Sequence, residues 1–164
     1  MRAKISNMLH AVLLVALVGS IGFGLSSASG QVEHGKAFAP DGLKWGAAPP
    51  MVPKGAQFAV LFGDPSKTGP FAIRLKLPGG FKIPAHNHSA FEAVTVISGD
   101  FNIGMGDKLD ETKAQKLTPG SFIFLPEKMN HFAFATTESV VQINSEGPFT
   151  INYVNKDDDP RTSK

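Results

Sequence analysis

The chain has 164 residues, and its 16 Lys and Arg against 14 Asp and Glu give a formal net charge of +2. Arg2 and Lys4 are the only charged residues among the first 30, so the rest of the chain balances 14 basic groups against the same 14 acidic ones. A neutral body without clustered Lys and Arg excludes nucleic acid and anionic lipid as partners bound through bulk charge. The absence of Cys excludes disulfides, thiolate nucleophiles, iron–sulfur clusters and Cys-type zinc sites, so any metal must be bound by His, carboxylate or carbonyl groups.

Residues 1–30 have the three-part pattern of a secretory signal peptide: a cationic start, an apolar run at 11–25, and small residues after it. We expect cleavage after Ala28 or Gly30, which makes the mature protein periplasmic or secreted and leaves it no stable membrane anchor. The alternative is a retained membrane anchor. The apolar run is shorter than the roughly 20 residues that a spanning helix needs, and three Gly interrupt it.

Residues 31–56 are rich in Pro and Gly and show no helical periodicity, which favours an N-terminal arm laid over the domain and anchored by Trp45. The alternative is a disordered leader, but the arm carries more apolar side chains than a solvated tail does.

From residue 57 the pattern changes to short strands separated by turn residues, which is typical of an all-β sandwich or barrel at 57–154. A helical turn is expected only at 110–116, and residues 155–164 read as a solvated C-terminal tail. The expected strands are 57–62, 71–77, 81–88, 92–98, 101–105, 121–125, 131–135, 140–144 and 150–154.

Three of the four His expected in the mature chain have a patterned setting, because PAHNHSAFE holds His86, His88 and Glu92 while EKMNHF holds His131. Residues two apart in a strand share a face and lie roughly 6 to 7 Å apart along it, so the imidazoles of His86 and His88 can converge on one ion. Glu92 shares their parity if the register survives the bend before it. Inward ionisable groups are costly unless they are paired or bind a metal.

This spacing resembles the first motif of the cupin family, G(x)5HxH(x)3-4E(x)6G, which matches position for position at Gly80, His86, His88, Glu92 and Gly99. The second cupin motif, G(x)5PxG(x)2H(x)3N, is met at Gly120, Pro126 and His131. Lys128 replaces its Gly and Ala135 replaces its Asn. The resemblance covers residues 57–154. The sequence is similar to small bacterial single-domain cupins, which implies a jelly-roll (double-stranded β-helix) barrel.

The resemblance also implies that His86, His88, Glu92 and His131 bind one divalent metal inside the barrel. Such a donor set suits Fe, Mn, Ni, Cu or Zn without selecting among them. The alternatives are hydrogen-bonded residues in a cupin that has lost its metal and, for Glu92, an outer group that orients an imidazole. Lys128 at the motif Gly implies either a different turn or strain relieved by Asn130.

Two weaker signals concern surfaces. The GDKLDETK segment at 106–113 lacks the pattern of a calcium loop and reads as a solvated connection. Phe122, Phe124, Phe132 and Phe134 alternate on two strands taken as neighbours, and with His131 inward the last two face outward. Such an aromatic stripe predicts contact with the N-terminal arm or with a second subunit in a homodimer.

Two functions follow as hypotheses. In the first, the protein is a metal-dependent oxygenase of a small organic molecule, with Glu92 as a proton acceptor. In the second, it is a cupin of the cell envelope that binds or senses a metal or small ligand without turnover. The expected interior, with Val94, Val96, Ala133 and either Ile103 or Met105, offers no second acid or base, which argues against hydrolysis and isomerisation. An inert barrel is a third hypothesis and requires that no metal is retained.

Overall fold

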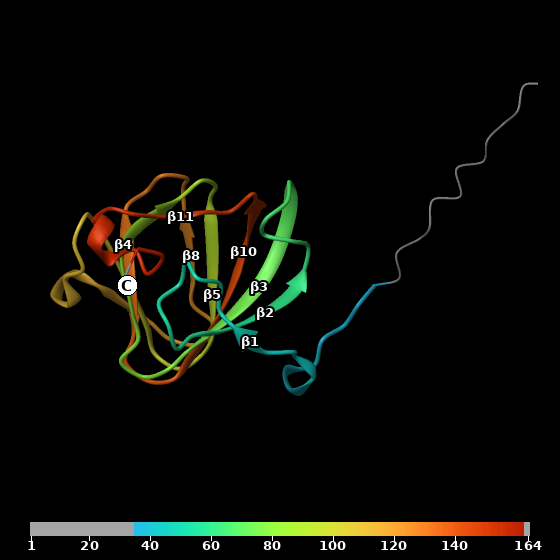
Figure 1. Ribbon diagram of the computed structural model, residues 1–164. Coiled ribbons are helices and arrows are strands. Elements are labelled where there is room, and N and C mark those ends of the chain that lie inside the picture. The colour runs from blue at the N-terminus through green and yellow to red at the C-terminus, as the bar shows by residue number, and fades with distance from the viewer. Residues whose placement is uncertain (1–34, 163–164) are drawn as a thin grey trace, which may run out of the picture. The chain divides into compact units, whose positions relative to one another are not determined.

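The computed structural model describes residues 35–162 (Figure 1). The expected signal peptide at 1–30 lies outside the described residues. The chain divides into two units, 1–36 and 37–164, and every element named below belongs to the second. Within residues 35–162, no helix has the length and apolarity needed to cross a membrane.

The strands form two antiparallel sheets that face each other. The six-stranded sheet has the order β1-β2-β3-β10-β5-β8, and the five-stranded sheet has the order β11-β4-β9-β6-β7. The strands of the first are β1 (Gly46–Ala47), β2 (Gln57–Phe62), β3 (Gly69–Leu77), β5 (Glu92–Ser98), β8 (Phe122–Leu125) and β10 (Ser139–Gly147). Those of the second are β4 (Lys82–His88), β6 (Phe101–Met105), β7 (Gln115–Leu117), β9 (His131–Ala135) and β11 (Ile151–Tyr153). Three short 3-10 helices complete the described part: η1 (Pro40–Gly42), η2 (Glu111–Lys113) and η3 (Lys156–Asp158).

The all-β prediction is confirmed, and each of the nine expected strands is present with ends that agree within three residues. Two further strands, β1 and β7, are too short to show an alternating pattern. The helical turn expected at 110–116 is divided between η2 and β7.

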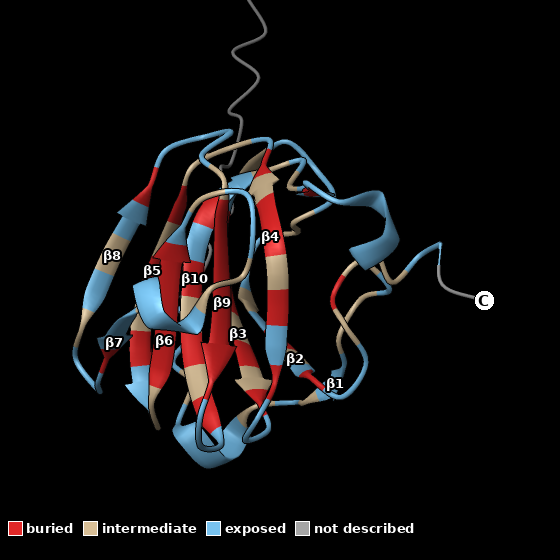
Figure 2. Ribbon diagram, turned by 90° about the vertical axis from the view of Figure 1, so that its left-hand side faces the viewer, coloured by how far each residue is buried: buried red, intermediate tan, exposed pale blue. Residues whose placement is uncertain are grey.

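The core lies between the two sheets and is built by period-two alternation. On β3, the side chains of Phe71, Ile73, Leu75 and Leu77 are buried against the opposite sheet, while Arg74 and Lys76 are only half-buried. Central strands carry most of the buried residues, and β9 is buried along its whole length (Figure 2).

A β-bulge in β4 sets which side chains enter the barrel. Between the pairs Ile83–Ala133 and His86–His131, β4 has one more residue than β9. Pro84 lies in this extra segment, where a residue without an N–H costs no ladder hydrogen bond. The bulge changes the parity of the strand, so Ile83 and His86, three residues apart, both line the interior.

The predicted aromatic stripe does not exist as one surface. Phe122 and Phe124 lie on β8 of the six-stranded sheet and are exposed, whereas Phe132 and Phe134 lie on β9 of the other sheet. Phe132 and Phe134 do point away from the barrel interior, but they are buried in a second apolar cluster with Ala85, Leu109 and Ala114. The prediction that the arm or a second subunit contacts this stripe is therefore wrong for Phe132 and Phe134, because the connection between β6 and β7 packs on them. This connection was expected to be only solvated. A homodimer stays a prediction that concerns Phe122 and Phe124 alone.

Residues 45–52 contact the barrel. β1 pairs with β2 at the edge of the six-stranded sheet, and Val52 belongs to the core cluster. The Tyr153 hydroxyl donates a 2.8 Å hydrogen bond to the Met51 carbonyl, and burial, together with the nearby Asp159, raises the pKa of Tyr153 to about 12. Trp45 is half-buried, with the Lys76 ammonium 4.6 Å from its ring centroid.

The tail expected to be solvated is exposed along η3 but returns to the barrel. Arg161 pairs with Asp159 at 2.7 Å and donates a hydrogen bond to the Ile151 carbonyl on β11.

Candidate metal centre

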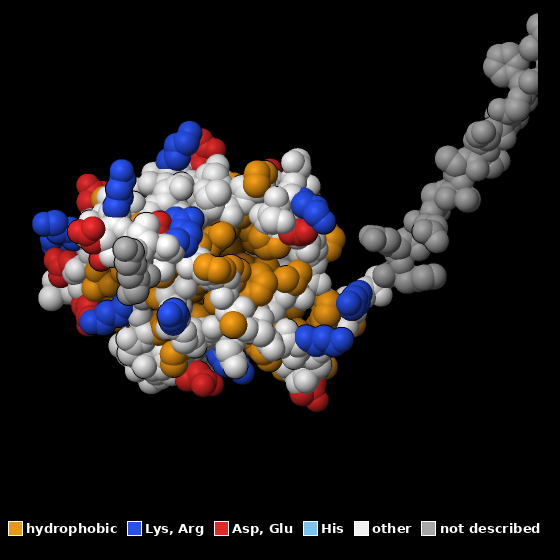
Figure 3. Space-filling model, in the orientation of Figure 1, with side chains coloured by type: hydrophobic (Ala, Val, Ile, Leu, Met, Phe, Trp, Pro, Cys, Tyr) orange, Lys and Arg blue, Asp and Glu red, His pale blue; other side chains and the backbone are white. Residues whose placement is uncertain are grey.

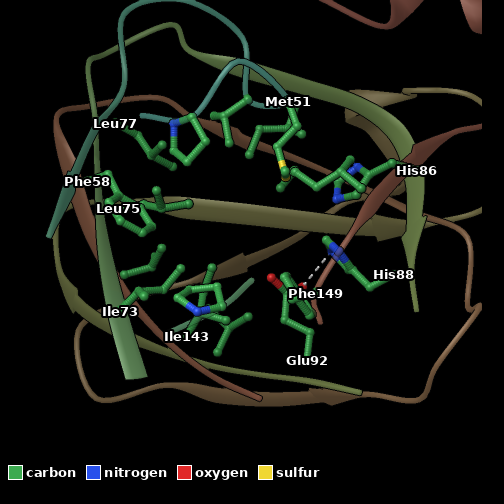
Figure 4. Close-up of a pocket in the computed structure, with 18 of the residues that line it drawn as sticks. Met51, Phe58, Ile73, Leu75, Leu77, His86, His88, Glu92, Ile143 and Phe149 are labelled. Atoms are coloured by element: carbon green, nitrogen blue, oxygen red, sulfur yellow. Dashed lines mark ion pairs between the residues drawn. The ribbon is translucent and has the colours of Figure 1, made fainter. Parts of the chain in front are cut away.

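Four of the sequence-predicted residues meet at one end of the barrel interior. His86 and His88 lie on β4, His131 begins β9 directly opposite His86, and Glu92 begins β5 in the other sheet. Their exposed fractions are between 2% and 6%, so all four side chains are buried. The carboxylate therefore comes from the sheet opposite to that of the three imidazoles. Figure 4 shows the His88 and Glu92 side chains pointing toward each other.

Backbone carbonyls fix the orientation of all three imidazoles. The Nδ1 atoms of His86, His88 and His131 lie 2.7, 2.8 and 2.9 Å from the carbonyl oxygens of Pro84, Thr150 and Met129. A carbonyl can only accept, so each Nδ1 carries the proton and donates it. The neutral tautomer that results has its lone pair on Nε2, which is the form of His that binds metals.

The free ring nitrogens converge on one region. The three His supply ligand atoms that lie within 4.8 Å of one another, a spacing at which they could hold one metal ion. Glu92 Oε2 lies 3.5 Å from His88 Nε2 and 3.4 Å from His131 Nε2. Glu92 therefore faces the same side of the imidazoles as an ion would, not the Nδ1 side from which an outer group would orient the rings.

This arrangement needs a positive charge between its members. With each Nδ1 protonated, a carboxylate and imidazole lone pairs face one another in a buried site, which is repulsive unless a proton or a metal ion lies between them. His88 Nε2 is buried and has no hydrogen-bond partner. An orphaned buried nitrogen aimed at two more imidazoles and a carboxylate fits a divalent transition metal by donor type and direction.

The site also separates the proton affinities of its groups. Burial, together with the neighbouring His131 and His88, lowers the pKa of His86 from 6.5 to about 3. Burial also disfavours the charged forms of His88 and Glu92, but their mutual attraction is stronger. The pKa of His88 is raised, and the pKa of Glu92 is lowered by His88 and His131. Without a metal, His86 is neutral and Glu92 is ionised.

The turn between β8 and β9 supports the site from outside. Lys128 has φ 60° and is the one non-Gly residue with positive φ in the described part of the chain, so it keeps the conformation of the motif Gly. Its N–H donates to the His88 carbonyl at 2.9 Å. The Asn130 side chain accepts from Asn87 and donates to Asp107, both at 2.7 Å. Of the two outcomes left open by the sequence, the structure has the second, a Gly-like turn held by Asn130.

An apolar cavity of about 360 Å³ adjoins the site. Val94, Ile103 and Ala133 line it as expected, whereas Val96 is buried outside the lining and Met105 is exposed. Phe149 was not predicted. Its ring stacks on His88 with centroids 4.3 Å apart and forms a wall of the site. No sequence pattern predicts Phe149 at the site, because this residue follows a turn instead of alternating within a strand.

Comparisons with known proteins agree with this architecture. A family model described as "Domain of unknown function (DUF4437)" matches residues 38–152. No curated protein matches the sequence. Among solved structures, the polyketide cyclase RemF from Streptomyces resistomycificus is 15% identical with a TM-score of 0.64, over 77% of this chain and 90% of that one.

Two further structures have the same architecture. An RmlC-like cupin from Shewanella frigidimarina is 16% identical with a TM-score of 0.52, over 68% of this chain and 91% of that one. A salicylate 1,2-dioxygenase from Pseudaminobacter salicylatoxidans is 17% identical with a TM-score of 0.51, over 63% of this chain and 32% of that one. At these identities the likeness shows the fold alone, which is the jelly-roll cupin barrel that the motifs predicted.

Proposed function

The chain belongs to the DUF4437 family, and we propose that it binds one divalent transition metal inside the barrel and acts there on a small organic molecule. His86, His88 and His131 would hold the ion, and Glu92 would be the fourth ligand. The observation that carries the proposal is the orientation of the three imidazoles, each fixed by a backbone carbonyl so that its Nε2 lone pair faces the others.

We favour an oxygenase-type reaction within this proposal. The metal, when bound, supplies Lewis acidity and the capacity to activate oxygen. The chain supplies the rest: Glu92 is ionised and buried beside the ligand nitrogens, where it can accept a proton from a bound molecule, and Phe149 excludes water from the His88 face. The apolar walls hold the organic molecule beside the site.

A second candidate is a protein that binds or senses a metal or ligand without turnover. One observation favours it. Apart from the four site residues, the only ionisable side chain among the described residues that line the cavity is Asp64, next to the exposed Ser66 loop position. One further carboxylate beside Glu92 gives the cavity few groups for proton transfer. Such a cavity is suited to binding a metal or ligand without turnover.

Metal content tests the shared part of both candidates. Protein without a His tag, exposed separately to Fe(II), Mn(II), Ni(II), Cu(II) and Zn(II), should retain about one equivalent of at least one ion. His88→Ala should retain less than about a tenth of an equivalent. His34→Ala is the control and should match the wild type. Less than a tenth of an equivalent in the wild type for every ion would defeat the proposal.

Oxygen consumption then separates the two candidates. The loaded protein is tested with a panel of diketones, phenols and thiols. Uptake that disappears in His88→Ala supports the enzyme, and full metal retention without uptake across the panel favours the binding role.

We further propose that the protein acts outside the cytoplasm. The exported chain should then begin at Ser29 or Gln31 by intact mass, and a mass that includes Met1 would contradict export.

A further inference from the structure

The cavity beside the site has a pronounced chemical asymmetry. One end holds the three His and Glu92, and the opposite end is formed by aliphatic side chains and Phe58 (Figure 4). On the surface, hydrophobic side chains gather around a hollow (Figure 3). Besides the four site residues, the polar side chains that line the cavity are Asp64 and Ser66, in the loop between β2 and β3. Within residues 35–162, no Lys or Arg lines the cavity.

This lining restricts what can bind. A hydroxyl or amide group placed against the aliphatic walls would lose its water without gaining a partner, at a cost of roughly 1–3 kcal/mol for each group. A sugar, a nucleotide or an amino acid carries several such groups. A phosphate or sulfate ester also needs a cationic partner, and away from the His and Glu cluster the described lining residues offer none.

We infer that the cavity takes a small apolar molecule with a single polar end, such as a phenol. The polar end would lie at the His and Glu cluster, and the apolar body would pack against Leu75, Leu77 and Ile143. The polar contact rests on the proposed metal site, whereas the apolar contacts do not. At about 360 Å³ the cavity lies at the small end of the range for ligand pockets, roughly 300–1,000 Å³, which suits one compact body such as a fused ring pair.

Val60 offers a way to block the cavity without disturbing the core. It lies on β2 opposite Ile73, lines the cavity and is 44% exposed. A Trp there can extend over the opening while its outer edge stays in water. Ile97 on β5 is the matched control, because it is an aliphatic strand residue with 40% exposure that does not line the cavity.

The test uses 1-naphthol as the fluorescent probe, titrated into metal-free and Zn(II)-loaded full-length mature protein. We expect saturable binding to both forms, at least tenfold weaker in Val60→Trp and changed by less than about twofold in Ile97→Trp. Glucose and glucose 6-phosphate at millimolar concentration should not displace the probe. Circular dichroism melting of both variants checks that they are folded.

The outcomes separate this inference from the proposed function. Naphthol bound by a protein that retains no metal would support the apolar cavity while the metal proposal fails. Metal retained without naphthol binding would overturn the inference and leave the metal proposal standing. Displacement by glucose, or equal effects of the two Trp variants, would also overturn it.

Discussion

Lys128 shows how one residue can depart from a motif and keep its geometry. Its φ of 60° belongs to the left-handed region, where a side chain costs roughly 1–2 kcal/mol relative to ordinary backbone. The hydrogen bond from its N–H to the His88 carbonyl and the side-chain bonds of Asn130 hold the turn in that conformation. Because these contacts use the backbone and a neighbour, the Lys128 side chain adds little. Its pairing with Glu127 is exposed, and exposed pairs contribute at most about 1 kcal/mol.

Lys128→Gly should therefore stabilise the protein by about 0.5–1 kcal/mol. The substitution removes the left-handed strain, and the greater freedom of Gly in the unfolded chain offsets part of the gain. Urea unfolding at pH 7 measures the change. Metal retention should stay equal to the wild type, because the N–H that reaches His88 remains.

Glu127→Gly is the matched control, since Glu127 is adjacent and has no positive φ. It should lose about 0.5–1 kcal/mol, because Gly has more conformational freedom in the unfolded chain. A Lys128→Gly protein less stable than the wild type would contradict the strain argument.

The residues of the site could be predicted from the sequence, but the carbonyl groups that fix each imidazole ring could not. His86, His88, Glu92 and His131 stand at a spacing that the chemistry of one ion explains. The acceptors that fix the rings are main-chain carbonyls, such as those of Pro84 and Thr150, and every residue has such a group. Only the folded backbone shows which carbonyl faces which ring.

At the scale of elements, strand patterns predicted where strands occur but not how they pair. Alternation from Phe81 to His88 cannot place Ile83 and His86 on one face, because they differ in parity. The pairing with β9 reveals the bulge that makes both face inward. Pro84 is the one local sign of it, since Pro in a strand is found at bulges and edges.

The prediction of a solvated connection between β6 and β7 is incomplete for a related reason. Most of its charged residues are exposed and indicate a solvated loop, but Leu109 and Ala114 pack on Phe132 and Phe134. Gly104 lets the Phe132 ring lie directly against β6, because a Cβ at Gly104 would lie within 2.2 Å of a ring atom. A loop with mostly polar residues can therefore cover an outer aromatic cluster through only two side chains.

Leu109→Ser should destabilise the protein by about 1–2 kcal/mol, because it uncovers part of this cluster and places a hydroxyl beside it. Thermal unfolding measures the loss. Lys108→Ser, one residue earlier and exposed, is the control and should change stability by less than about 0.5 kcal/mol. Equal effects of the two variants would mean that the connection does not cover the cluster in solution.

At the scale of the whole molecule, the site joins the two sheets. The three His come from the five-stranded sheet and Glu92 from the six-stranded one. A ligand that binds only the folded protein stabilises it in proportion to the logarithm of its concentration over Kd. Without metal, the same buried groups instead make folding depend on protons.

That proton dependence can be predicted for the metal-free protein from the signs of the pKa shifts. The pKa of His86 is lowered from 6.5 to about 3, so below pH 6.5 the unfolded chain takes up a proton that the folded one does not. In this window the free energy of unfolding should decrease as the pH decreases, by at most about 1.4 kcal/mol per pH unit from His86. His88, whose pKa is raised, acts oppositely, because its contribution is complete below 6.5 and is lost as the pH rises through its folded value. Glu92, whose pKa is lowered from 4.5, contributes above pH 4.5 and loses its contribution only at lower pH.

Urea unfolding with a chelator present separates these contributions, measured between pH 6.5 and 5 for His86 and between pH 6.5 and 8 for His88. His86→Gln removes the group that resists protonation, so its stability should fall less than that of the wild type across the window, by up to about 2 kcal/mol. His88→Gln removes the group whose contribution is lost above pH 6.5, so between pH 6.5 and 8 its stability should fall less than that of the wild type as the pH rises. The two variants are matched in chemistry and lie two residues apart on one strand, so effects on opposite sides of pH 6.5 can arise only from the different surroundings of the two rings. Parallel pH profiles for all three proteins would show that the imidazoles are not held in the buried, carbonyl-fixed arrangement from which the metal site is inferred.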